Sequence, residues 1–93
     1  MIVHFGCKDT QAIWDGTRTK RWSTDIVNRG LRKLFLIHSA EDIRDLMVPP
    51  SNRLHKLKGD LRDYYSISVN EQWRLIFKWN DGIATDVQLV DYH

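Results

Sequence analysis

The sequence predicts an α+β fold in which N-terminal helices cover one face of a small, mainly antiparallel sheet. In the first half of the chain, apolar residues recur at helical spacing. In the second half, apolar and polar residues alternate, as they do in strands with one buried face. The tripeptide Asn-Asp-Gly at 80–82 is a strong hairpin signal, because Asn and Gly tolerate a positive φ. Helices followed by hairpin-linked strands are typical of this fold class.

Three helical segments are expected. The first covers residues 9–16 and ends in a glycine. The second and clearest lies within residues 21–40, where Ser23 or Thr24 could cap the N-terminus and apolar residues fall mostly three or four apart. The third covers residues 40–47 and ends before two prolines, because the residue that precedes a proline avoids the helical region.

Three strands are expected, at residues 65–69, 73–79 and 83–90, and the first five residues are also compatible with a strand. The middle strand alternates two sets of side chains: Trp73, Leu75, Phe77 and Trp79 against Arg74, Ile76 and Lys78. We expect the aromatic-rich set to pack against the helices. Arg74 and Lys78 are then left on the exposed face of the sheet.

Composition narrows the class of protein. The length favours one small domain, residues 1–93, with a single core. The only cysteine, Cys7, excludes an internal disulfide and favours a reducing compartment. The apolar runs are far shorter than a membrane span of about 20 residues, and charge follows the N-terminus too soon for a secretory signal. A cytoplasmic location is therefore expected.

Basic residues gather in two stretches although the formal net charge is only +2. Residues 18–33 contain six Lys or Arg and one Asp (Arg18, Lys20, Arg21, Arg29, Arg32 and Lys33 against Asp25). Residues 53–62 contain a second cluster (Arg53, His55, Lys56, Lys58 and Arg62) just ahead of the first strand. This distribution fits a basic patch on one face, although ordinary solvated charges on a helix and a loop would give the same pattern.

The exposed sheet face, the second basic cluster and the end of the chain could converge on a site for RNA cleavage. Such cleavage needs a base for the ribose 2′-hydroxyl, an acid for the departing 5′-oxygen, and cations for the phosphorane. Histidine can serve as acid or base, Arg and Lys can stabilise the charge, and Tyr or His can stack on a base. Neither a metal nor a cofactor is required, because the nucleophile comes from the substrate. Bland readings stay open: a solvated histidine, an Arg74 paired with Asp63 or Asp86, and a frayed terminus.

Three segments carry a resemblance to a known family: RLHKLKGD at 53–60, YYSISVNEQWRLIFKW at 64–79 and VQLVDYH at 87–93. They resemble the HigB toxins, the host-inhibition branch of the RelE/ParE superfamily. The resemblance implies a compact RelE-like microbial-RNase fold and a ribosome-dependent mRNA endonuclease that inhibits translation. It also implies a helix-turn-helix antitoxin of the HigA type encoded alongside, a complex that represses its own operator DNA, and action at the ribosomal decoding site.

The resemblance also implies roles for individual residues. His55, Asp91, Tyr92 and His93 match the catalytic positions, with His93 or His55 in proton transfer, Asp91 as an alternative base and Tyr92 against a nucleobase. Lys58 and Arg74 match the positions that hold phosphate, and Arg53 and Lys56 add RNA-binding charge beside them.

Two other functions remain possible from the sequence. One is a gyrase-directed toxin of the same fold, which would perform no RNA chemistry. The other is a non-catalytic module that only binds the antitoxin.

Overall fold

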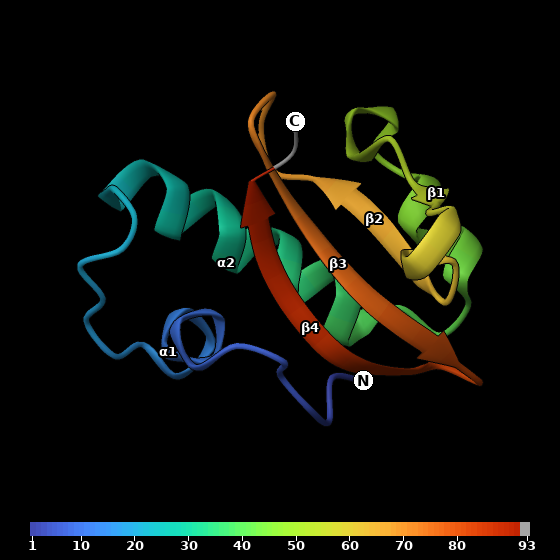
Figure 1. Cartoon of the computed structure of the whole chain (residues 1–93), viewed down its shortest axis with the longest axis horizontal. Helices are drawn as coiled ribbons and strands as arrows, with labels where there is room; N and C mark the ends of the chain where they lie inside the picture. Colours follow the sequence, from blue (N-terminus) through green and yellow to red (C-terminus); the bar gives the residue numbers. More distant parts are fainter. Residues whose placement is uncertain (92–93) are drawn as a thin grey trace.

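Helices lie on one face of a four-stranded antiparallel sheet, which confirms the predicted α+β class (Figure 1). The computed structural model describes residues 1–91. Along the chain the elements are α1 (Lys8–Asp15), α2 (Thr24–Ser39), η1 (Ile43–Met47), η2 (Pro50–Asn52), β1 (His55–Lys56), η3 (Gly59–Leu61), β2 (Tyr64–Ser68), β3 (Trp73–Asn80) and β4 (Ile83–Asp91). In the view of Figure 1, α2 runs behind β3 and β4, so the face towards the reader is the one opposite the helices. No helix among these residues is long and apolar enough to cross a membrane.

The two α-helices begin and end where the sequence indicates. Gly16 ends α1 in the left-handed conformation, at φ 74°. Ser23 caps α2, because its hydroxyl accepts a hydrogen bond from the backbone N–H of Ile26 at 3.3 Å. The third expected helix is instead the 3₁₀ helix η1, which is five residues long. Prolines stop the chain here after a single turn or so, and a short segment of this kind commonly keeps i→i+3 bonds.

The sheet has the order β1-β2-β3-β4, and every neighbouring pair is antiparallel. The three expected strands are β2, β3 and β4. The fourth, β1, consists of two residues inside the second basic cluster, which was not predicted to pair. The N-terminal segment runs beside β4, with parallel bridges from Ile2 to Ala84 and from Phe5 to Val87.

The core lies between α2 and the sheet, as predicted. Leu34 and Ile37 of α2 are fully buried, as are Leu75 and Phe77 of β3. On the opposite face, Lys78 is exposed as expected, but the expectation that Arg74 would be exposed is wrong, since only 7% of its surface is accessible. Interior strands have neighbours on both sides, so their side chains are flanked across two strand pairs.

Candidate functional site

The strand register places the central candidates on one face of the sheet. His55 of β1 pairs with Ser66 of β2, and two residues further along β2, Ser68 pairs with Arg74 of β3. Paired residues of antiparallel strands point to the same side, and alternate residues of one strand share a face. His55 and Arg74 therefore occupy neighbouring rows of the face opposite the helices, which we call the His55 face (His55, Ser66, Ser68 and Arg74).

The imidazole of His55 is held by a backbone carbonyl. Its Nδ1 lies 2.9 Å from the carbonyl oxygen of Arg53. A carbonyl can only accept, so Nδ1 donates its proton, and in the neutral ring Nε2 keeps its lone pair. Arg53 itself is left-handed, at φ 48° and ψ 47°, immediately after η2. This bend presents its carbonyl to the histidine, and the exposed ring is then oriented to accept a proton through Nε2.

Arg74 brings a cation to the same face from an interior strand. It is buried to the same degree as the neighbouring Ile76. Charges interact more strongly where water is excluded, and a guanidinium offers five N–H donors in a planar fork that matches phosphate oxygens. The position suits stabilisation of a developing negative charge on a phosphate.

The two lysines of the second cluster are separated by strand parity. Lys56 pairs with Tyr65, on the side opposite to His55, and its Nζ lies 5.5 Å from the centre of the Tyr65 ring. The register does not bring Lys56 to the His55 face. Lys58 is exposed just beyond β1, where it precedes η3.

The last part of the predicted site is only partly described. Asp91 ends β4 opposite Trp73, so it points to the other side of the strand from the His55 face. Its exposed carboxylate accepts a hydrogen bond from Gln72 Nε2 at 3.2 Å. Tyr92 and His93 lie outside the described residues.

Sequence reasoning missed a second polar pair on the sheet. Tyr64 pairs with Lys78, and its hydroxyl donates to the carboxylate of Asp86. This hydrogen bond, together with burial, raises the pKa of Tyr64 to about 12. Asp86 has a φ of 54° and sits at a shift in the register between β3 and β4.

A signal for this irregularity was present in the sequence. The buried residues Ala84 and Val87 are three apart instead of two, as a bulge requires. Gly6 also leaves room for the pair, because a Cβ at that position would collide with the Asp86 carboxylate.

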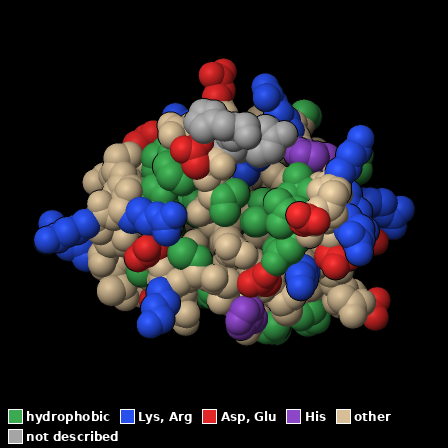
Figure 2. Space-filling view, viewed as in Figure 1, with side chains coloured by type: hydrophobic (Ala, Val, Ile, Leu, Met, Phe, Trp, Pro, Cys, Tyr) green, Lys and Arg blue, Asp and Glu red, His purple; other side chains and the backbone are tan. Residues whose placement is uncertain are grey.

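The surface of this side combines an apolar middle with charged margins. Figure 2 shows hydrophobic side chains over the central strands and Lys and Arg side chains mostly towards the edges of the view. Within residues 1–91, no three His, Cys, Asp or Glu side chains gather in an arrangement that could hold a metal ion.

Comparison with known proteins gives this geometry a family. Residues 4–93 match the model of the RelE-like toxin of the type II toxin-antitoxin system HigB. The chain belongs to the HigB family of toxins. Toxin HigB-1 of Vibrio cholerae is 41% identical over 75 residues, which cover 81% of this chain and 79% of that protein. Endoribonuclease HigB of Proteus vulgaris is 32% identical over 93 residues, the whole of both chains.

A solved structure supports the fold of this HigB-family toxin. The structure of the YoeB-YefM complex from Staphylococcus aureus contains a chain that matches all of the toxin with a TM-score of 0.63. The match covers 95% of that chain at 19% identity, so it bears on the fold alone. The resemblance read from the three sequence segments is thus confirmed at the level of the family.

Proposed function

We propose that this HigB-family toxin is an endoribonuclease that cleaves mRNA on the ribosome by metal-independent acid–base catalysis. The observation that carries the proposal is the placement of His55 and Arg74 on one face, with the His55 ring oriented through Nδ1 by the Arg53 carbonyl. The full-length relative from Proteus vulgaris is named an endoribonuclease, which supports the same chemical class here. A toxin of this kind inhibits translation and growth from within the cytoplasm.

The reaction uses the substrate's own hydroxyl. His55 Nε2 accepts the proton of the ribose 2′-hydroxyl, and the 2′-oxygen forms a new bond to phosphorus. The bond from phosphorus to the 5′-oxygen then breaks, and a second group donates a proton to that oxygen. The products are a 2′,3′-cyclic phosphate and a free 5′-hydroxyl. Asp91, Tyr92 and His93 are the candidates for the second group, and Tyr92 would also contact a nucleobase.

Cations provide the remaining stabilisation. Arg74 would bind the non-bridging oxygens of the scissile phosphate, where its low-dielectric position makes the interaction strong. Lys58 and Arg53, both exposed at the ends of β1, would bind the neighbouring phosphates. The exposed Lys56 would contact RNA only at the other side of this strand, because its register turns it away from His55.

The partners follow from the same proposal. Membership of a toxin–antitoxin family supports an antitoxin that binds the toxin. We propose that it is a helix-turn-helix protein of the HigA type, that the complex contacts operator DNA only through the antitoxin, and that the free toxin acts at the ribosomal decoding site.

The test is cleavage of a short mRNA by the purified toxin, with and without programmed ribosomes, followed by mapping of the new 5′ ends. We expect cuts inside the reading frame only when ribosomes are present, and their loss in a folded variant without His93. Equal cutting of naked RNA would remove the ribosome from the proposal. No cutting, together with inhibited DNA supercoiling by gyrase, would favour the gyrase-directed alternative, and inertness in both assays would leave a non-catalytic antitoxin-binding module.

A further inference from the structure

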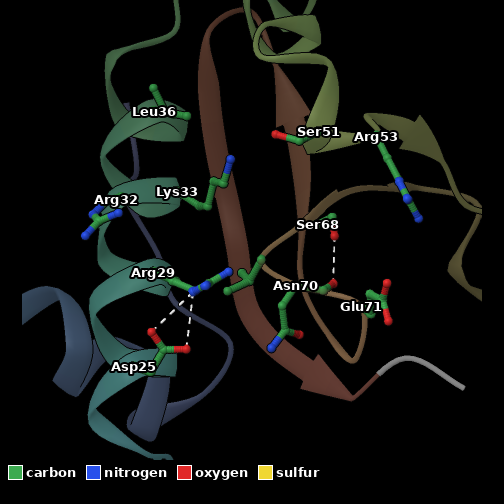
Figure 3. Close-up of a pocket in the computed structure, with 11 residues that line it drawn as sticks. Asp25, Arg29, Arg32, Lys33, Leu36, Ser51, Arg53, Ser68, Asn70 and Glu71 are labelled. Atoms are coloured by element: carbon green, nitrogen blue, oxygen red, sulfur yellow. Dashed lines mark hydrogen bonds and ion pairs between the residues drawn. The ribbon is translucent and has the colours of Figure 1, made fainter.

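A groove of about 810 Å³ lies beside the proposed catalytic site, between α2, the segment around η2 and the β2–β3 turn (Figure 3). Its cationic side chains are Arg29, Arg32, Lys33 and Arg53. Three of them come from the first basic cluster, which the catalytic proposal does not use. The groove thus gives that cluster a specific place in the fold.

The cations of the groove differ in how far they are already engaged. Arg29 forms an ion pair with Asp25 at 3.2 Å. Lys33 donates to the side-chain oxygen of the buried Asn52, and burial lowers the pKa of Lys33. Arg32 and Arg53 are exposed and form no ion pair within residues 1–91. These two guanidiniums can therefore receive carboxylates from a ligand.

The rest of the lining favours a protein segment over RNA. Leu36 and Val69 provide an apolar floor, and Asp25 and Glu71 add carboxylates that would repel a phosphate chain. The described lining residues include no aromatic ring, whereas sites for unpaired nucleotides commonly stack bases on aromatic side chains. Cations around an apolar floor are complementary to a peptide whose acidic and apolar residues alternate on one side.

We propose that this groove binds an acidic, amphipathic segment of the antitoxin, an inference that rests on the antitoxin partner proposed above. Carboxylates of the segment pair with Arg32 and Arg53, and its apolar side chains pack on Leu36 and Val69. The segment occupies the groove without covering the His55 face.

A short chain of contacts connects the groove with His55. Lys33 bonds to Asn52, which is fixed by two further hydrogen bonds from its amide to the carbonyls of Leu46 and Val48, at 3.1 and 3.3 Å. Arg53 follows Asn52 directly, and its carbonyl orients the His55 ring. A segment that binds the Arg53 side chain therefore reaches the residue that holds the proposed base.

The experiment compares two double variants with the same change in net charge. Arg29→Glu/Arg32→Glu reverses the charge of the groove, and Arg18→Glu/Lys20→Glu reverses two exposed charges in the loop before α2. The affinity of each purified toxin for the full-length antitoxin encoded beside it is measured, together with mRNA cleavage on ribosomes by the free toxin. We expect at least tenfold weaker antitoxin binding for the groove variant and less than a threefold change for the loop variant, with folding of both checked by thermal unfolding.

Each other outcome overturns the groove proposal. Slower cleavage by the groove variant with unchanged antitoxin affinity would assign the groove to RNA. Equal weakening by both double variants would reduce the effect to overall charge, and no weakening would place the antitoxin elsewhere. Failure of the proposed function is seen separately, as a wild-type toxin that does not cleave mRNA on ribosomes or does not bind the antitoxin at all.

Discussion

The His55 face and the groove are both cationic, but the groups around their charges differ. On the His55 face, one buried guanidinium lies among strand residues whose positions are fixed by backbone pairing. In the groove, several cations share an irregular surface with carboxylates and an apolar floor. A rigid site with few polar groups suits the small geometric tolerance of bond cleavage. A wider surface with mixed charge suits recognition of a partner.

The largest effect is expected from a pair of neighbouring substitutions on β1. His55→Ala removes the proposed base and should slow cleavage on ribosomes roughly 10²–10⁴-fold. Lys56→Ala is the matched control, because the register turns Lys56 to the opposite side of the same strand. Its effect should stay within about threefold, since a loss of one contact worth less than about 0.6 kcal/mol changes a rate by no more than that. Rates of single-turnover cleavage measure both.

A similar loss in both β1 variants would contradict the assignment of the site to one face. It would indicate that the charge or the stability of β1 matters, and not the orientation of His55. Antitoxin affinity provides a second readout, because His55→Ala should leave the groove unchanged and so keep binding near the wild-type value.

The sequence predicted those parts of the fold that depend on local pattern. The limits of α1 and α2 follow from Gly16 and Ser23, and three strands follow from alternation and the turn at 80–82. The strand β1 could not be predicted in this way, because two residues carry no period and pair only once β2 is in place. The 3₁₀ form of η1 was also hidden, since the sequence marks where a helix stops more clearly than its hydrogen-bond pattern.

The candidate site was predictable in composition but not in orientation. Resemblance and parity selected His55 and Arg74, and the structure brings them to one face. Separation of Lys56 from His55 needed the register of β1, and burial of Arg74 needed the neighbouring strands. The groove joins residues from α2 with residues near η2 and the β2–β3 turn, so no single stretch of sequence contained it.

A smaller effect is expected at the far end of the sheet, where Tyr64 donates to Asp86. Tyr64→Phe should lower the free energy of unfolding by about 1–2 kcal/mol, because the carboxylate loses a partner. Cleavage should change little, which would confine the chemistry to the end of the sheet that carries His55 and Arg74. A large loss of cleavage in a variant that remains folded would extend the site to this pair.

The same pair predicts a dependence on pH. The folded pKa of Tyr64, about 12, lies above its ordinary value of 10.0, so the folded chain holds the proton more tightly than the unfolded chain. The stabilisation is therefore fully present below the unfolded pKa and is lost as the pH rises towards the folded value. Urea unfolding of wild type and Tyr64→Phe from about pH 7 to about pH 11 should show a constant difference that shrinks only above about pH 10. A difference that disappears near neutral pH would assign the stabilisation to another group.

The smallest effect is expected at Gly30, which lies inside α2 between the cations that line the groove. A Cβ added there would meet Ile13 Cδ1 and Leu89 Cδ2 at 3.9 Å, an ordinary contact. Gly30→Ala should therefore stabilise the fold by about 0.5–1 kcal/mol, because alanine loses less backbone freedom in a helix. Thermal unfolding measures the gain, and antitoxin affinity and cleavage should both stay at wild-type values, since neither region contains this side chain. Unchanged stability with altered antitoxin affinity would instead show that binding in the groove depends on flexibility of α2.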